Sequence, residues 1–369
     1  MNRSKHDAFV IGGGPAGLVA AIALRRKGLR VTVADGGDAP SDKACGEGIL
    51  PEGIAALERL GVALDWSAGR AFRGIRLVKG DAVAQAEFGT SAGLGMRRIG
   101  LHRQLIRAAE LSGVSILWRT PVTGIAEQCV FASGDHFPAR WIVGADGFRS
   151  LVRDWAGLES RKSPRLRFAF RQHFACTPWT DCVESHWAEK AQLYVTPVSA
   201  NEVGVVALSR NPKLRLREAL SLFPNVSARL ANCEPTTAER GAVTGNLVLP
   251  RVTRGRIALI GDASGTVDAI AGEGMSLAFL QAEALAEAIA QENLAAYETA
   301  HARLRRRPIW MARALLAMEN RIWAQERVVR IFSSEPQLFR RMLSGHAGEG
   351  STFSLASAGA RLGWRLLAA

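Results

Sequence analysis

The spacing of hydrophobic and polar positions changes twice within the first 35 residues. Asp7–Ile11 is a short apolar run, and Pro15–Lys27 has apolar residues at helical spacing. Leu29–Ala34 then alternates and ends in Asp35. This order predicts a strand, a helix and a second strand, with a glycine-rich turn between the first strand and the helix.

The alternation of helical and apolar segments continues to about residue 160. Helices are predicted at Pro51–Leu60, which Gly61 closes, and at Leu101–Leu111. Strands are predicted at Ser115–Trp118 and Trp141–Ala145, because both are short and apolar. Such an order of elements is typical of an α/β protein.

The hydrophobic period becomes two between about Leu166 and Ser209, where turn signals separate the alternating runs. A buried apolar strand returns at Arg256–Gly261, and a long helix follows at Met275–Ala290. Everything after about Gln291 is helical in character. The pattern therefore predicts a β-rich insertion between two α/β segments, followed by a helical C-terminal region.

Composition adds limits to this picture. The chain has 369 residues, of which 48% are hydrophobic and 22% charged, an ordinary globular balance. No segment approaches the roughly 18 apolar residues that span a bilayer, and the start lacks a secretory signal. The five cysteines are scattered without a Cys-x-x-Cys pair, so we expect reduced thiols, no metal site and a cytoplasmic location.

The net charge of +13 favours anionic partners. Neither a zinc finger nor an RNP-like motif occurs, so nucleic acid is not expected among them. From Arg303 onward, arginines are mixed with tryptophans and apolar residues at helical spacing. We favour a helical cover over the nucleotide-binding domain with its arginines in solvent. The alternative is peripheral membrane contact through an interfacial helix. A lipophilic substrate would favour this alternative.

The turn after the first strand has the pattern Gly-x-Gly-x-x-Gly. Gly12 permits the tight turn, Gly14 lets the backbone approach a pyrophosphate, and Gly17 lets helix and strand pack closely. The helix that begins at Pro15-Ala16 presents its N-terminal N–H groups to the phosphates. Asp35 ends the second strand, where a carboxylate can accept hydrogen bonds from ribose hydroxyls. The unit predicts a dinucleotide site.

FAD and NAD both fit this unit, and later segments favour FAD. A buried strand ends in Gly261-Asp262, where the carboxylate can bind a ribityl hydroxyl. Gly272-Glu273-Gly274-Met275 then opens a long helix. The positive end of that helix suits the flavin carbonyl edge, where negative charge accumulates on reduction. A third element places Asp146 directly after another buried strand.

These three elements, in this order, resemble the FAD-dependent monooxygenases of the p-hydroxybenzoate hydroxylase fold. That superfamily also holds geranylgeranyl reductases and flavin-dependent halogenases, and the resemblance covers about residues 7–290. It implies that Asp146 supports the pyrophosphate region and that Asp262 binds the ribityl chain. It also implies cofactor contacts for Arg98, at the start of a helix, and for the backbone of Val122.

The expected fold class is therefore α/β, with a Rossmann-like FAD-binding domain of the p-hydroxybenzoate hydroxylase type, an inserted β-sheet substrate domain and a C-terminal helical region. The expected ranges are 1–66, 96–160 and 246–290 for the discontinuous FAD-binding domain, 67–95 and 161–245 for the substrate domain, and 291–369 for the helical region.

Some segments resemble the geranylgeranyl reductase-like branch more than the simple hydroxylases. Cys45-Gly46 is similar to the cysteine-glycine segment of that branch, and Gly272–Gly274 is similar to its Gly-Glu-Gly turn. Tyr194–Pro197 resembles a reduced form of its aromatic motif, without the central tryptophan. The Trp-x-Trp-x-Ile-Pro segment of tryptophan halogenases is absent, so halogenation is not expected.

The catalytic residues stay open at this level. Cys45 lies near Lys43 in a glycine-rich loop, which could lower the pKa of its thiol and suit it to proton transfer. The alternative, which we favour, is a small residue packed against the flavin ring. Candidate acid/base residues are Cys45, Glu47, Glu273 and Tyr194, and candidate pocket residues on the inserted sheet are His173, His186, Trp187 and Tyr194. We assign none of them, because in this fold the flavin carries most of the chemistry.

We expect an FAD-dependent oxidoreductase, reduced by NAD(P)H, that acts on an apolar or aromatic small molecule under the inserted sheet. Two reactions compete. Oxygenation is favoured by the general frequency of reactions in the family, and reduction of a prenyl double bond is favoured by the Cys45 and Gly272–Gly274 segments. We favour the monooxygenase. A third interpretation is a flavoprotein without turnover that serves another protein as a partner or maturation factor.

Overall fold

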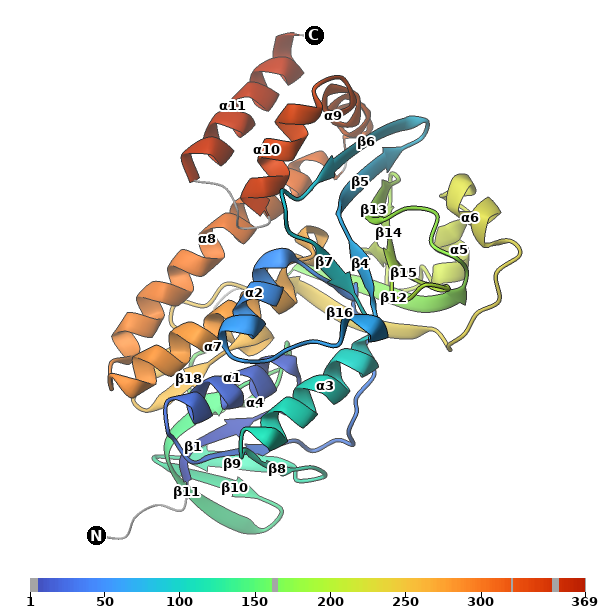
Figure 1. The fold of residues 1–369 in the computed structure, drawn as a ribbon. Helices are drawn as coiled ribbons and strands as arrows, with labels where there is room; N and C mark the ends of the chain where they lie inside the picture. Colours follow the sequence, from blue (N-terminus) through green and yellow to red (C-terminus); the bar gives the residue numbers. More distant parts are fainter. Residues whose placement is uncertain (1–5, 161–164, 320, 347–351, 369) are drawn as a thin grey trace.

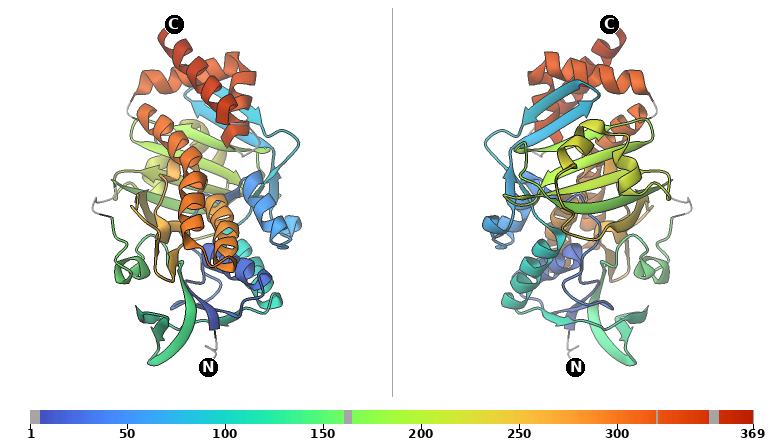
Figure 2. Two further views of the ribbon diagram at one scale, coloured as in Figure 1. Left: turned by 90° about the vertical axis from the view of Figure 1, so that its left-hand side faces the viewer. Right: turned by 90° about the vertical axis from the view of Figure 1, so that its right-hand side faces the viewer.

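The computed structural model describes residues 6–160, 165–319, 321–346 and 352–368. The described chain forms three stacked parts (Figure 1). An α/β unit lies at the N-terminal end, a large sheet lies in the middle, and helices of the C-terminal region lie at the opposite end. Figure 2 shows from two sides that one long helix, α8 (Leu294–Met318), runs from the first part toward the last.

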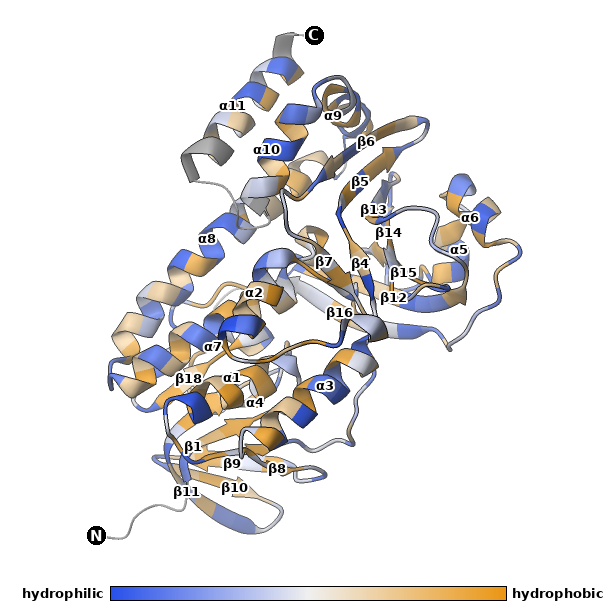
Figure 3. Ribbon diagram, viewed as in Figure 1, coloured by the Kyte–Doolittle hydropathy of each residue, from blue (hydrophilic) through white to orange (hydrophobic). Residues whose placement is uncertain are grey.

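The α/β unit is built on an eight-stranded sheet. Its main path is β17-β18-β11-β1-β2-β8, and β9 and β10 extend it beside β11. The strands are β1 (His6–Ile11), β2 (Val31–Ala34), β8 (Ser115–Leu117), β9 (Val122–Ala126), β10 (Cys129–Ala132), β11 (Asp135–Gly144), β17 (Thr253–Arg254) and β18 (Ile257–Leu259). The helices of this unit are α1 (Pro15–Arg26), α3 (Arg98–Leu111), α4 (Leu151–Trp155) and α7 (Gly274–Ala290). Apolar residues concentrate in β1, β11 and α1 (Figure 3), which form its core.

The register of the parallel strands gathers the glycine and aspartate segments at one edge. Ile11 at the end of β1 pairs with Ala34 of β2 and with Gly144 of β11. Gly144 in turn pairs with Leu259 of β18. The four segments that follow these strands therefore leave the sheet side by side, at the carboxyl edge where α/β sheets bind their ligands.

A seven-stranded sheet forms the middle part, in the order β16-β12-β15-β14-β13-β5-β6. Its strands are β5 (Gly74–Lys79), β6 (Ala82–Glu87), β12 (Arg165–Ala175), β13 (Cys182–Trp187), β14 (Ala191–Pro197), β15 (Glu202–Ser209) and β16 (Arg240–Asn246). The short helices α5 (Leu216–Leu220) and α6 (Pro224–Leu230) pack on one of its faces. A small sheet of β3 (Gly48–Ile49), β7 (Gly93–Gly95) and β4 (Arg70–Phe72), with α2 (Pro51–Arg59), joins the two larger parts. The observed architecture confirms the predicted fold class, while the exact domain boundaries stay a prediction.

The C-terminal helices differ from the expected cover in two respects. α8 packs on α7, as expected, but α9 (Ile322–Ser334) and α10 (Pro336–His346) pack on the β5–β6 hairpin and α11 (Thr352–Ala368) packs on α10. The reason is an apolar cluster of α9 and α10 side chains that meets the hairpin, with Phe332 stacked on Phe339. The arginines are also not all in solvent, because Arg305 is buried and donates hydrogen bonds to the carbonyl oxygens of Leu247 and Thr266. None of the described helices has the length and apolarity needed to cross a bilayer.

Candidate active site

A cavity of about 1370 Å³ runs from the carboxyl edge of the parallel sheet to the C-terminal helices. Ordinary small-molecule pockets measure roughly 300–1,000 Å³, so this one has room for more than one small ligand. The predicted cofactor residues on its wall are Gly12, Gly14, Pro15, Ala16, Asp35, Cys45, Gly46, Arg98, Val122, Asp146, Gly261, Asp262, Gly272, Gly274 and Met275. Gly17, the remaining predicted cofactor residue, is described by the structure but does not line the cavity.

The glycine turn brings backbone atoms into direct contact. Gly12 has a φ of +109°, and a Cβ on it would lie 2.5 Å from the carbonyl oxygen of Ala145. A Cβ on Gly17 would lie 1.9 Å from the carbonyl oxygen of Gly12, so α1 can approach the end of β1 only without a side chain there. Gly14 differs, because the nearest described atom to its Cβ position is Nη2 of Arg98 at 3.9 Å. The N-terminus of α1 therefore opens onto the cavity, and no described side chain caps it.

Two side chains hold this turn in place. The Asp35 carboxylate accepts hydrogen bonds from the backbone N–H groups of Gly13 (2.7 Å) and Gly37 (2.8 Å). His102 lies on the other side, where Nδ1 accepts from the Ser41 N–H (2.9 Å) and Nε2 donates to the Gly13 carbonyl (2.7 Å). Burial lowers the pKa of His102, which keeps this ring neutral. The role of His102 was not predicted, because a single histidine on a helix carries no motif.

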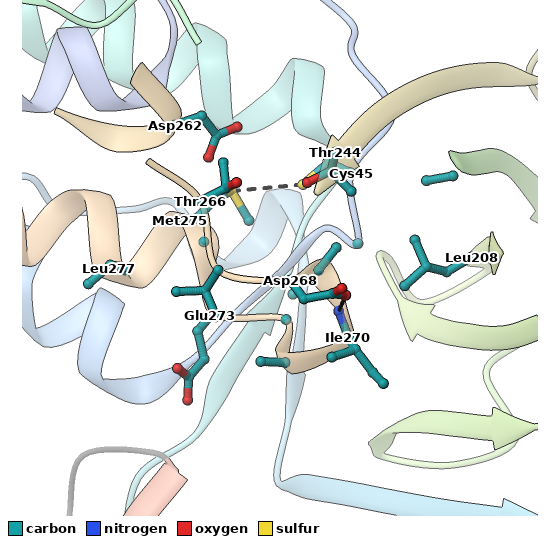
Figure 4. A pocket seen from close by; sticks show the side chains of 18 of the residues that line it. Cys45, Leu208, Thr244, Asp262, Thr266, Asp268, Ile270, Glu273, Met275 and Leu277 are labelled. Carbon is teal, nitrogen blue, oxygen red and sulfur yellow. Dashed lines mark hydrogen bonds between the residues drawn. The ribbon is translucent and has the colours of Figure 1, made fainter. Parts of the chain in front are cut away.

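The two aspartates of the later strands have different environments. The Asp146 carboxylate accepts hydrogen bonds from the Ser150 hydroxyl (2.6 Å) and the Val152 N–H (3.1 Å), so it fixes the start of α4 beside the cavity. The Asp262 carboxylate borders the cavity itself (Figure 4). The side chain is exposed to the cavity, but the protein atoms around it raise the pKa of Asp262, while the charge of Arg98 opposes the shift. A hydroxyl donor is a suitable partner for such a carboxylate.

Cys45 lies at the middle of the cavity, opposite the start of α7 (Figure 4). Its Sγ is 4.0 Å from Sδ of Met275 and accepts a hydrogen bond from the Glu47 N–H at 3.4 Å. Burial raises the pKa of the Cys45 thiol, and the nearby charge of Arg98 does not compensate. The lowered pKa considered for a thiol near Lys43 is therefore not found, because the cost of burying a thiolate is larger than the attraction of the surrounding cations. The group is a protonated thiol.

Glu47 is engaged in a buried charge cluster. Its side chain is 1% exposed, and its carboxylate accepts from the backbone N–H of Arg98 (2.8 Å). It also contacts Nη1 of Arg171 (3.0 Å) and Nε2 of His173 (2.6 Å) on β12. Arg171 further binds Asp42 at 2.7 Å. The cluster ties the loop that carries Cys45 to the large sheet, and it connects residues more than 120 positions apart.

The other candidates divide between the wall of the cavity and the core behind it. Tyr194 and Trp187 line the cavity. Of the described histidines, His173 is held by Glu47, and His186 is held by Glu184 at 2.9 Å, so neither reaches the wall. Glu273 also borders the cavity, but Figure 4 shows its carboxylate directed away from Cys45 and Asp262. The two histidines, which were candidates for the pocket, instead face carboxylates inside the protein.

A second buried ion cluster holds the turn before α7. Arg167 on β12 contacts Asp268 at 2.6 Å and Glu319 near the end of α8 at 2.5 Å. The Tyr194 hydroxyl donates to the carbonyl oxygen of Ile270 in the same turn (2.9 Å), and burial raises the pKa of this phenol. The turn that leads into Gly272 is thereby fixed from the large sheet. These contacts were not predicted, since Arg167 and Asp268 are 101 residues apart in sequence.

The far end of the cavity is apolar. It is lined by three side chains of the large sheet and by the inner faces of the C-terminal helices. They are Ile75, Leu77 and Val183 from the sheet, and Met311, Leu315, Met318, Val328, Phe332, Phe339, Met342, Leu343, Leu362 and Leu366 from the helices. We call this region the helical end, and the region around Gly12–Ala16, Asp35 and Val122 the dinucleotide end.

Comparisons with known proteins agree with this geometry. The FAD binding domain family matches residues 5–305. A putative 2-heptyl-3-hydroxy-4(1H)-quinolone synthase of Rhodococcus erythropolis is 30% identical over 308 residues, which cover 77% of this chain and 79% of that protein. The menaquinone reductase of Mycobacterium tuberculosis is 26% identical over 323 residues, 78% of each protein. A flavoprotein/dehydrogenase from Cytophaga hutchinsonii has the same fold, with a TM-score of 0.80 at 19% identity over 93% of this chain and 92% of that one.

Proposed function

This chain belongs to the FAD binding domain family and is an FAD-dependent oxidoreductase, and on that premise we propose that it is a monooxygenase that acts on a lipophilic molecule with NAD(P)H as the reductant. The observation that carries the proposal is the continuity of one cavity. It begins at the dinucleotide end, passes Cys45 and continues into the helical end as one space. A cofactor and an apolar substrate therefore fit into the same space.

The dinucleotide end fits FAD. The open position above Gly14, at the N-terminus of α1, is suited to a pyrophosphate. Asp35 has lone pairs left for ribose hydroxyls beside its two backbone contacts, and Asp262 faces the cavity where the ribityl chain is expected. When bound, FAD supplies the redox chemistry, and the protein supplies binding, orientation and a dry environment.

The helical end favours a substrate with an apolar tail. Its wall is aliphatic and aromatic, so the tail would be stabilised by burial of apolar surface, at about 25 cal/mol per Å². The reactive part would then lie near Cys45 and Tyr194, between the two ends. The names of two relatives support this class, since one makes a hydroxylated quinolone with a heptyl chain and the other reduces menaquinone.

Two hydroxyl groups at the middle of the cavity are already engaged by backbone carbonyls, so neither is a proton donor to a substrate. The Tyr194 hydroxyl is used by Ile270, and the Thr196 hydroxyl donates to the Gly46 carbonyl at 2.8 Å. These side chains fix the loop and the turn around the reacting atoms, and their hydrogen atoms are not available to a substrate.

The test is turnover of the FAD-loaded protein with NADPH or NADH, with an alkylated quinolone and a prenylated quinone as candidate substrates. We expect a hydroxylated product whose new oxygen derives from labelled O₂. Product formed at the same rate without O₂ would exclude the monooxygenase. Flavin that NADPH and NADH leave oxidised with every candidate substrate would instead support a flavoprotein that acts as a partner or maturation factor.

Reduction of a substrate double bond is the second candidate, and Cys45 is the observation that favours it. Such a reduction adds a hydride and a proton, and a protonated thiol lies at the middle of the cavity. If this reaction occurs, Cys45→Ala lowers anaerobic turnover while FAD stays bound. Cys45→Ala without effect on anaerobic turnover removes the thiol from the reaction.

A further inference from the structure

The helical end reaches the surface between α8, α9 and α11. Trp310 and Trp323 line the cavity and are nevertheless 39% and 59% exposed. Ile322, beside Trp323, is 46% exposed. Leu362 and other residues of α11 complete the wall, and Trp310 lies against Gly359. Large apolar side chains at the opening of an apolar cavity mark a surface that meets an apolar partner.

Exposed arginines follow the same side of α8. Arg303, Arg306 and Arg313 are spaced three or four residues from one another or from Trp310, so they share its side of the helix. Arg321, directly before α9, is also exposed and lies at the wall of the cavity. None of these four arginines has an acidic partner within 4 Å in the described part of the chain. Their guanidinium groups are available to an external anion.

Some of the other arginines of this region are paired with acidic residues. Arg361 and Arg365 on α11 both pair with Glu335 at 2.7 Å, and Arg330 pairs with Glu326. From Arg303 to the end the sequence has twelve arginines and four glutamates, which accounts for eight of the 13 excess positive charges of the chain. Within the described part of the chain, four exposed arginines without an acidic partner within 4 Å lie beside the opening of the helical end, and two more, Arg340 and Arg341, lie on α10.

We propose that this surface, formed by Arg306, Trp310, Arg313 and Arg321–Trp323, docks on an anionic lipid membrane and takes its substrate from the bilayer. The proposal rests on the lipophilic substrate proposed above. Tryptophan rings settle at the boundary between headgroups and acyl chains, and each nearby arginine is attracted by anionic headgroups. The opening of the helical end would then face the acyl chains directly.

Two other partners fit the surface less well. A second copy of the chain in a two-fold pair would place the same arginines opposite one another, where like charges repel. A nucleic acid would match the arginines, but it would leave an apolar cavity open beside its phosphates. A bilayer satisfies both the charge and the apolar opening.

The test uses the FAD-loaded full chain and flotation with vesicles. One set contains phosphatidylcholine alone, and the other contains equal parts of phosphatidylcholine and phosphatidylglycerol. We expect strong binding to the anionic vesicles, weak binding to the neutral ones, and weakening by salt because surface charges are screened. Each arginine near the surface contributes about fivefold to partitioning, so Arg306→Gln with Arg313→Gln should lower it about 25-fold.

Matched controls separate a docking surface from overall charge. Arg103→Gln with Arg107→Gln removes two exposed arginines from α3 and should leave vesicle binding nearly unchanged. Trp323→Ala should reduce the binding that survives high salt, whereas Trp66→Ala, at a 40% exposed site outside the cavity wall, should not. Both double variants should keep the thermal transition of the parent protein.

Several outcomes would overturn the proposal. The first is that the protein does not bind anionic vesicles, and the second is that the two double variants lose vesicle binding equally. The third is tighter binding to a single-stranded oligonucleotide that competes with vesicles. The fourth is a dimer that dissociates when Arg306 and Arg313 are changed. Failure here is distinguishable from failure of the proposed function. A protein that oxygenates a detergent-dispersed substrate but ignores vesicles contradicts only the docking surface, and the reverse result contradicts only the reaction.

Discussion

At the dinucleotide end the wall of the cavity is largely backbone, whereas at the helical end it is apolar side chain. A single Cβ at Gly12 or Gly17 would collide with a carbonyl oxygen, so the first wall tolerates few sequences. The second wall requires apolar side chains of suitable total volume, which many sequences supply. The difference teaches why one cavity can have a cofactor site with a sharp sequence pattern and a substrate site without one.

The largest effect that would test this contrast is expected from Gly17→Ala. The new methyl group would lie 1.9 Å from the Gly12 carbonyl oxygen, which forces α1 away from β1 at the centre of the core. We expect loss of a cooperative thermal transition and of FAD binding, measured by calorimetry and flavin fluorescence. Gly17→Ala protein with a parental melting temperature would show that the close approach is not required.

Gly14→Ala is the matched comparison. Its methyl group meets no described atom closer than 3.9 Å, and the φ of −71° suits alanine, so folding should be unchanged. The methyl group would occupy the space over the helix N-terminus, and we expect FAD to bind at least about tenfold more weakly, a difference of about 1.4 kcal/mol. Unchanged FAD affinity would mean that the pyrophosphate lies elsewhere.

The next effect concerns the buried cluster between the two ends. Glu47→Ala leaves the buried His173 without a carboxylate and leaves Arg171 with Asp42 alone, and breaking such a buried pair costs about 3–5 kcal/mol. We expect this loss in the free energy of unfolding from denaturant titration. Glu47→Gln keeps hydrogen bonds to both partners and should recover part of it. Equal effects of the two variants would contradict a role for the carboxylate charge.

The same contrast explains how far the sequence alone could predict the molecule. Gly12, Gly14 and Asp35 follow directly from local spacing, since the register of β1 with its neighbours brings adjacent strand ends together. Arg167 and Arg171 were not predictable, because their partners lie more than 100 residues away and salt bridges have no periodic pattern.

The lowered pKa that was considered for Cys45 fails for a related reason. Nearby cations are visible in the sequence, but the burial that outweighs them is a property of the fold. The C-terminal region was correctly predicted as helical. The periodicity of these helices could not show, however, that α9 and α10 pack on the β5–β6 hairpin.

A pH dependence is expected where α8 connects the two ends. His301 on α8 forms a hydrogen bond with the Ser264 hydroxyl (2.9 Å), and burial lowers the pKa of His301 to about 3. The unfolded chain takes up a proton near pH 6.5 and the folded one does not, so stability is full above pH 6.5 and decreases as the pH falls toward 3. Between pH 7 and 5 this histidine should cost about 2 kcal/mol.

The measurement is the free energy of unfolding of the parent and of His301→Gln at both pH values. Glutamine keeps a hydrogen-bonding group near Ser264 and does not titrate, so the variant should lose less stability on acidification. Equal losses in the two proteins would assign the acid sensitivity to groups other than His301.

The smallest effect on folding is expected at the helical end. Leu315 lines the cavity and is half-buried, so Leu315→Ala enlarges an existing space and should cost about 1 kcal/mol or less. KM should rise with the length of the substrate tail that loses contact, while FAD affinity stays at the parental value. Leu316→Ala, next to it but outside the wall, serves as the control, and its KM should not change. If Leu315→Ala weakened FAD binding as much as Gly14→Ala does, the two ends would be one coupled site. The contrast between a backbone wall and a side-chain wall would then no longer explain why the two ends tolerate substitutions differently.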